Sequence, residues 1–139
     1  MTTTLRAIRA GLLVPLALLL AGAAPAAHAT PGHGLPGNWL RLAVTRGDAR
    51  SSDTRGVLLL CDPPQGHAHA ARACRQLRAA GGDIGRIPRR AGSLCPMLYA
   101  PVTASAQGVW EGRRVDYRHA FSNSCVMGAE TGAVFDLPV

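Results

Sequence analysis

The sequence predicts an α+β fold: a five-stranded antiparallel sheet packed with two helices, one principal and one short, and stabilised by two disulfides. Several short segments alternate apolar and polar residues, as half-buried strands do. One segment has the apolar stripe of an amphipathic helix and ends in two glycines. Four cysteines, an even number, all follow an apolar leader, which favours disulfides in an oxidising compartment.

The leader, residues 1–29, has the features of a signal peptide. A short basic start precedes an apolar run over residues 10–21, and Ala27 and Ala29 form the A-x-A pattern of a signal-peptidase site. The run contains Pro15 and is shorter than the roughly 20 apolar residues that cross a bilayer, so an uncleaved membrane anchor is the weaker alternative. Cleavage after Ala29 leaves 110 of the 139 residues as a secreted, extracellular protein.

Residues 30–37 are rich in glycine and proline and predict a flexible N-terminal arm, whereas residues 38–139 have the length of one domain. All fifteen basic residues are arginines, and two of them lie in the leader, which leaves thirteen against eight acidic residues. These arginines are scattered and few aromatic residues lie among them. The charge therefore does not indicate a nucleic-acid partner, nor a membrane partner once the leader is removed.

The first two strands are predicted at residues 38–47 and 55–61. Leu40, Leu42 and Val44 alternate with more polar residues, which is typical of a half-buried strand. The second segment is apolar at nearly every position, which favours a central strand covered on both faces. Residues 62–66, DPPQG, are predicted to form a loop.

The principal helix is predicted at residues 67–80. Ala70, Cys74 and Leu77 share one stripe, the arginines of the segment lie on the opposite side, and Gly81 with Gly82 ends the helix. Residues 84–90 are predicted to hold the short second helical turn before Pro88.

Three further strands complete the predicted sheet. Residues 102–110 and 113–121 form a hairpin around Glu111-Gly112, and residues 132–137, GAVFDL, follow as the last strand. From the residues alone, the four cysteines allow three pairings, of which Cys61–Cys74 with Cys95–Cys125 is the most local.

Neither a metal centre nor a catalytic site is predicted. Cys61, His67, His69 and Cys74 resemble a ligand set, but their spacing fits no common zinc finger, and oxidation would remove both thiolates. We expect both histidines to be exposed on the first turn of the helix. The sequence has no G-x-S-x-G segment, phosphate-binding glycine loop or paired carboxylates, so we expect no cofactor and no enzymatic activity.

The segment SLCPMLYAP, residues 93–101, is the strongest candidate for a functional site. Its two prolines exclude a helix interior or a central strand, so the segment is predicted to be an extended loop with three large apolar side chains in a row. A protease cleft binds extended peptides, and an unbranched side chain such as that of Met97 fits a deep apolar pocket. The alternative is that Met97 and Leu98 pack into the core.

The segments CPMLYAPV, GVWEGRRVDY and FSNSCVM, with GGD after the helix, closely resemble the Streptomyces subtilisin inhibitor family of secreted serine-protease inhibitors. The resemblance implies a homodimer that inhibits subtilisin-type proteases, with trypsin-like or chymotrypsin-like proteases as further partners depending on the residue at position 97. It also implies the bridges Cys61–Cys74 and Cys95–Cys125, and a return strand in FSN-x-C. The reactive bond would be Met97–Leu98, and the loop residues that contact the protease would be Leu94, Cys95, Pro96, Tyr99, Ala100 and Pro101.

One segment departs from the family pattern. Residues 86–94, RIPRRAGSL, are more basic than the resemblance leads us to expect, so Arg89 and Arg90 are predicted to affect selectivity among proteases. Two other functions compete with inhibition. A secreted hydrolase would need a catalytic constellation, and a cationic nucleic-acid-binding protein would bind with a steep salt dependence.

Overall fold

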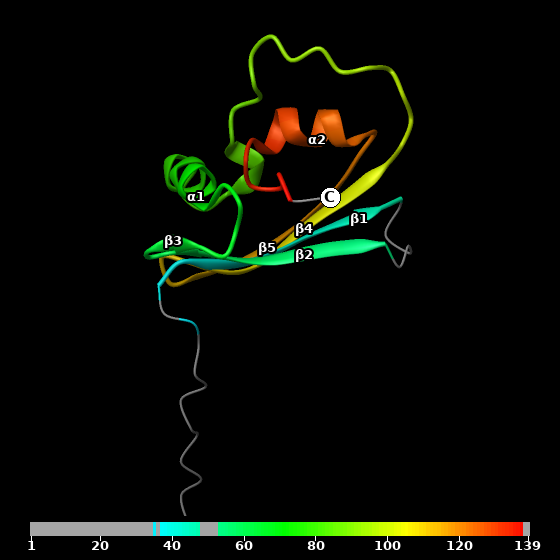
Figure 1. The fold of residues 1–139 in the computed structure, drawn as a ribbon. Coiled ribbons are helices and arrows are strands. Elements are labelled where there is room, and N and C mark those ends of the chain that lie inside the picture. The colour runs from blue at the N-terminus through cyan, green and yellow to red at the C-terminus, as the bar shows by residue number, and fades with distance from the viewer. Residues whose placement is uncertain (1–34, 36, 48–52, 138–139) are drawn as a thin grey trace, which may run out of the picture. The chain divides into compact units, whose positions relative to one another are not determined.

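The structure is a computed structural model that describes Leu35 and residues 37–47 and 53–137 (Figure 1). The predicted signal peptide, residues 1–29, lies outside the described residues, as does most of the predicted arm, residues 30–37. In the described part, no helix has the length and apolar character needed to cross a membrane.

One antiparallel sheet forms the base of the molecule, with strand order β3-β2-β1-β4-β5. Two α-helices and a short 3-10 helix cover one face of it (Figure 1). The predicted fold class is therefore confirmed, with two disulfides. In chain order the elements are β1 (Trp39–Arg46), β2 (Thr54–Cys61), β3 (Pro64–Gln65), α1 (Ala70–Ala79), η1 (Ile84–Arg86), β4 (Val102–Trp110), β5 (Arg113–Phe121) and α2 (Ser124–Thr131).

The core lies between the covered face of the sheet and the helices. The alternation predicted for β1 places Leu40 and Leu42 in this core, both fully buried. The apolar stripe of α1 packs in the same core, and its Cys74 and Leu77 are also fully buried. The helix ends at Ala79, and the turn after it contains Gly82, whose φ of 81° favours glycine and whose position against the Trp110 ring leaves no room for a Cβ atom.

The predicted hairpin is confirmed. Strands β4 and β5 pair from Val102 opposite Phe121 to Trp110 opposite Arg113, around a two-residue turn. Both turn residues, Glu111 and Gly112, have positive φ, as a tight hairpin requires.

The predicted last strand, residues 132–137, is wrong. Gly132 ends α2 at a φ of 62°, and the next N–H, that of Ala133, donates to Oε1 of Gln76 in α1 at 2.8 Å. The segment therefore turns against α1 and buries Val134 and Phe135 without pairing to the sheet. The fifth strand is instead β3, within the segment predicted to be a loop, where Gln65 pairs with Leu60.

The second α-helix, α2, lies where a return strand was expected. Strand β5 ends at Phe121, and the FSN-x-C segment then begins the helix, because the Asn123 side chain caps it. The predicted second helix at residues 84–90 is only the 3-10 turn η1.

The positions of His67 and His69 also differ from the prediction. Both are half-buried and precede α1, with His69 at its N-cap position. The helix begins later than predicted because Nδ1 of His67 accepts the backbone N–H of His69 at 2.8 Å, which closes a separate turn.

The uncovered face of the sheet carries a patch of half-buried apolar side chains. In the strand register, Trp39 of β1 lies opposite Leu60 of β2 and Val109 of β4, and Leu58 is two residues from Leu60 on the same face. We name these four residues the sheet-face patch. The patch explains why β2 is apolar at nearly every position, although β1, and not β2, is the middle strand.

His67 makes stability depend on pH. Burial lowers the pKa of His67 below its ordinary value, and the neighbouring His69 lowers it further. The Val134 backbone and the Asp136 carboxylate have weaker, opposite effects. The unfolded chain then binds a proton at this site more readily than the folded chain. We therefore expect stability to fall as the pH drops through about 6.5, the ordinary histidine pKa. Urea unfolding at several pH values should show a smaller loss for His67→Gln than for the wild type, and equal losses would contradict the prediction.

Candidate functional site

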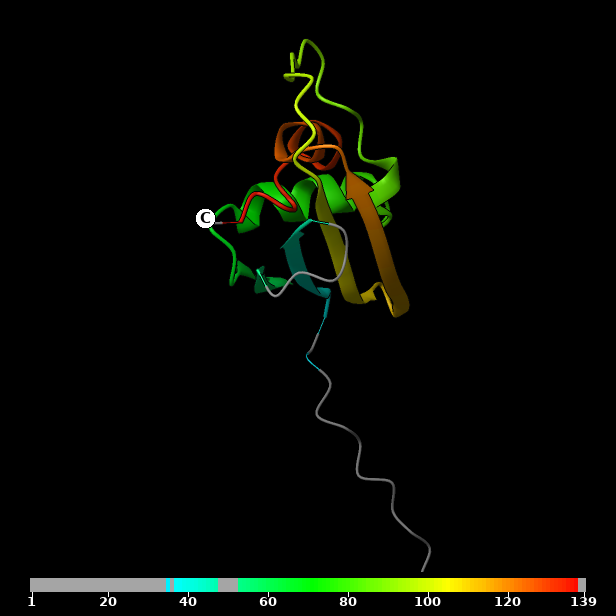
Figure 2. The same ribbon diagram turned by 90° about the vertical axis from the view of Figure 1, so that its right-hand side faces the viewer.

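Residues 93–101 form an exposed loop that arches over α2 and projects far from the sheet (Figures 1 and 2). The loop has no helix or strand conformation. Relative exposures are 96% for Leu94, 106% for Met97, 61% for Leu98 and 80% for Tyr99. The alternative that Met97 and Leu98 pack into the core is therefore wrong, because both side chains point to solvent.

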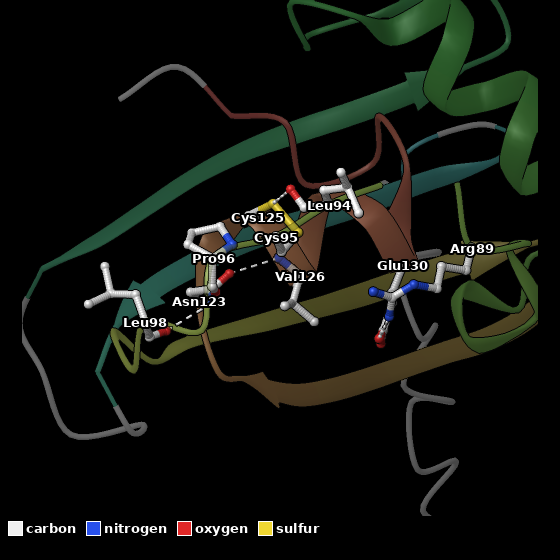
Figure 3. Close-up of a disulfide and its surroundings, with 9 residues drawn as sticks. All are labelled: Arg89, Leu94, Cys95, Pro96, Leu98, Asn123, Cys125, Val126 and Glu130. Atoms are coloured by element: carbon white, nitrogen blue, oxygen red, sulfur yellow. Dashed lines mark hydrogen bonds and ion pairs between the residues drawn. A yellow bond between two sulfur atoms is a disulfide. The ribbon is translucent and has the colours of Figure 1, made fainter. Parts of the chain in front are cut away.

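A disulfide joins the loop to α2. Cys95 in the loop is bonded to Cys125 in the first turn of the helix, with 5.6 Å between the Cα atoms (Figure 3). The second bridge, Cys61–Cys74, joins the end of β2 to α1 in the core. These are the two pairings that the family resemblance implies. Among the described residues no cysteine is free and no cluster of potential metal ligands is found.

Asn123 connects α2 to both sides of Met97. Its side-chain Nδ2 donates to the carbonyl oxygen of Pro96 at 3.2 Å and to that of Leu98 at 2.9 Å (Figure 3). Its Oδ1 accepts the N–H of Val126 at 2.9 Å, which caps the helix. The side chain is almost fully buried, and its amide nitrogen uses both of its N–H donors. One amide therefore fixes the loop to the start of the helix.

The carbonyl group of Met97 lies between these two anchored carbonyls. Within the described part of the chain it accepts no hydrogen bond, whereas both of its neighbours do. The backbone of the loop is thus held on either side of residue 97, and the Met97 carbonyl oxygen is left for an external donor.

Further backbone hydrogen bonds fasten both ends of the loop. On the C-terminal side, Ala100 donates to the carbonyl of Ser122 at 2.9 Å, and Pro101 accepts from the N–H of Gly47 at 2.7 Å. On the N-terminal side, Arg90 donates through its backbone N–H to Ala129 of α2 at 2.8 Å. The loop is therefore anchored to α2 along the length of the helix.

The basic segment before the loop contributes an ion pair to this anchoring. Nη1 of Arg89 lies 2.6 Å from Oε1 of Glu130 in α2 (Figure 3). The Arg89 side chain is 54% exposed, so solvent screening limits the pair to about 0–1 kcal/mol. Arg89 thus contributes a weak contact at the base of the loop, whereas no ion pair is recorded for Arg90 in the part of the chain described.

A hollow of about 980 Å³ lies beside the base of the loop. Loop residues Leu94, Ala100 and Pro101 line it together with residues of α2 and of β1.

The residues predicted for the site lie together in this one loop, and Asn123 lies beside them without having been predicted. Asn123 received no role from the sequence, although asparagine is among the preferred helix N-cap residues. Its bonds to Pro96 and Leu98 span 27 and 25 positions of sequence, so no local pattern could reveal them.

Comparison with known proteins gives consistent matches. A relative in Streptomyces avermitilis, named "Putative serine protease inhibitor", is 58% identical over 99% of this chain and 90% of its own length. The subtilisin inhibitor of Streptomyces albogriseolus is 40% identical over 86% of this chain and 81% of its own.

A solved structure has the same fold. Streptomyces caespitosus sermetstatin, crystallised in complex with Bacillus licheniformis subtilisin, matches with a TM-score of 0.59 and 35% identity, over 70% of this chain and 96% of its own. The model of the family described as subtilisin inhibitor-like matches residues 36–123, more than half of the chain and the whole of the loop. The chain therefore belongs to the subtilisin inhibitor-like family.

Proposed function

We propose that this protein inhibits subtilisin-type serine endopeptidases by offering Met97–Leu98 as a substrate-like bond. The observation that carries the proposal is the conformation of the loop: Met97 is fully exposed while the backbone on both sides of it is anchored to α2. Family membership supports the same activity, and sermetstatin is known in complex with a subtilisin.

Binding would place the Met97 side chain in the apolar pocket beside the protease's catalytic serine. Residues on either side, from Leu94 to Pro101, would lie extended along the cleft and pair with its backbone. Because the loop is already ordered by the Cys95–Cys125 bridge and by Asn123, little conformational entropy is lost on binding. Interfaces of this kind bury roughly 1,600 Å² and reach very high affinity.

The same anchoring would make cleavage unproductive. Attack of the serine on the Met97 carbonyl breaks the peptide bond only if the Leu98 amine departs. The residues before the bond remain attached through Cys95–Cys125, and those after it remain attached through Asn123 and through the Ala100–Ser122 hydrogen bond. The amine stays beside the acyl-enzyme at a high effective concentration, which favours re-formation of the bond.

We further propose that the protein acts outside the cell. Residues 1–29 would direct export and be removed, residues 30–37 would form an arm, and residues 38–139 would form the inhibitor domain. Two disulfides within one small domain support an oxidising compartment.

We also propose a homodimer formed through the sheet-face patch. Trp39, Leu58, Leu60 and Val109 share the face that no helix of the described residues covers, with the exposed Arg41 opposite Leu58 at the edge of the patch. The stacking of two such faces would remove these side chains from water, as in a β-sandwich. The reactive loops lie over the opposite face of the sheet, so dimerisation would leave both of them accessible (Figure 2).

The Met97 pocket contact gives the first test of inhibition. Titration of the wild type into subtilisin with a chromogenic substrate should give stoichiometric loss of activity. Met97→Asp should weaken inhibition by at least about 100-fold, because an apolar pocket would have to accept a charge.

Met97→Arg should gain inhibition of trypsin, because the pocket of trypsin pairs with a cation. Arg75→Asp on the exposed side of α1 is the matched control and should inhibit as the wild type does. Unchanged inhibition by Met97→Asp would place the reactive bond elsewhere.

Two substitutions at Asn123 distinguish its role in anchoring the loop from its role in capping α2. Asn123→Asp keeps the oxygen that caps α2 but loses both donors to the loop, whereas Asn123→Ala loses both functions. We expect both variants to be hydrolysed by subtilisin at Met97–Leu98 faster than the wild type. Both variants should lose the stability that the two loop hydrogen bonds contribute, and Asn123→Ala should in addition lose the roughly 1 kcal/mol that a cap contributes, measured by urea unfolding. Hydrolysis of Asn123→Asp at the wild-type rate would show that the two hydrogen bonds do not retain the cleaved loop.

The dimer is tested by a charge within the sheet-face patch. Leu58→Asp should shift the protein from dimer to monomer in sedimentation equilibrium, since burial of an unpaired carboxylate at an interface is costly. Arg75→Asp introduces the same charge on α1 and should remain dimeric. A wild type that is monomeric at micromolar concentration would refute this interface.

A further inference from the structure

The two methionines in the described part of the chain have opposite environments. The Met97 side chain is fully exposed, at 106%, whereas Met127 in α2 is 6% exposed and packs in the core. Their thioether sulfurs therefore differ strongly in their access to small reagents in solution. Oxidation of methionine depends on such access.

Few other sulfur atoms could react in place of Met97. All four cysteines are bonded in disulfides, and no thiol is free in the residues that the structure describes. Met97 thus carries the one exposed thioether of this part of the chain, and it stands at the centre of the loop.

We propose that Met97 is a site of reversible oxidation by peroxides, and that its sulfoxide switches inhibition off. This inference rests on the proposed function, since it concerns the side chain that would enter the protease pocket. The sulfur lone pair attacks one oxygen of hydrogen peroxide and the O–O bond breaks. An S–O bond forms, sulfur is oxidised by two electrons, and the peroxide is reduced to water.

The sulfoxide would oppose binding because its oxygen is a strong hydrogen-bond acceptor. In the free loop this oxygen is hydrated, whereas in an apolar pocket it would lose its water without a replacement donor. We expect inhibition to weaken by roughly 10- to 100-fold, which corresponds to about 1.4–2.8 kcal/mol at 1.4 kcal/mol per tenfold change.

The fold would tolerate this modification and permit its repair. The loop is held by the carbonyls of Pro96 and Leu98 and by the Cys95–Cys125 bridge, none of which involves the Met97 thioether. The sulfoxide would project from the loop, where a methionine sulfoxide reductase can reach it. That enzyme removes the oxygen as water and oxidises a dithiol to a disulfide. Met127, by contrast, is protected from peroxide by burial, so the core would remain unmodified.

The test is titration of subtilisin with the purified protein that lacks residues 1–29, before and after treatment of that protein with dilute hydrogen peroxide. Peptide mass mapping should find one added oxygen at Met97 before any at Met127, together with a 10- to 100-fold weaker inhibition. Methionine sulfoxide reductase with dithiothreitol, at a concentration that leaves both disulfides intact, should restore inhibition.

Two matched variants assign the effect to one sulfur. For each variant, inhibition is compared before and after peroxide. Met97→Leu should show no change on treatment, whereas Met127→Leu should remain as sensitive as the wild type. Oxidation of Met97 without loss of inhibition, or equal loss in Met97→Leu, would overturn this inference alone. Absence of inhibition by the untreated wild type would overturn the proposed function, and this switch with it.

Discussion

The hydrogen bonds of the Asn123 side chain are the interaction on which the displayed loop depends. One amide caps α2 through its oxygen and holds two loop carbonyls through its nitrogen. Each such bond contributes roughly 0.5–1.5 kcal/mol, and loss of the buried asparagine would leave several groups unpaired at once. Because the cap and the loop share one side chain, the start of the helix and the position of Met97 are fixed together.

Helix α2 is a support for the loop more than an independent element. Its sequence has weak helix propensity, with Gly128 in its middle, and its stability comes from tertiary contacts. The Cys95–Cys125 bridge and Asn123 hold its N-terminal end, and the Gln76 side chain of α1 accepts the first N–H beyond Gly132. The disulfide and the Gln76 contact also explain why the sequence did not predict α2, because each of them joins residues that are distant in the chain.

The strands and the loop were predictable for local reasons. Alternation in β1 follows from one covered face, and Pro96 with Pro101 excludes regular structure between them. The error at residues 132–137 arose because a short apolar run after a turn signal is typical of a buried strand, whereas here residues 133–135 form a buried turn. Only the positive φ of Gly132 and the contact to Gln76 decide between the two, and the sequence displays neither. The role of Asn123 was missed for the same reason, since it depends on the proximity of helix and loop.

The loop separates the group that is recognised from the groups that hold it in place. Its backbone is positioned by Asn123, the Cys95–Cys125 bridge and Ser122, and none of these contacts involves the side chain at position 97. That side chain can therefore change its chemistry, by substitution or by oxidation, while the peptide bond beside it keeps its geometry. Under the proposed function, selectivity among proteases and resistance to cleavage would then be set by different atoms. The side chain at position 97 could then change the selectivity without reducing the resistance to cleavage, because the contacts with α2 stabilise the loop.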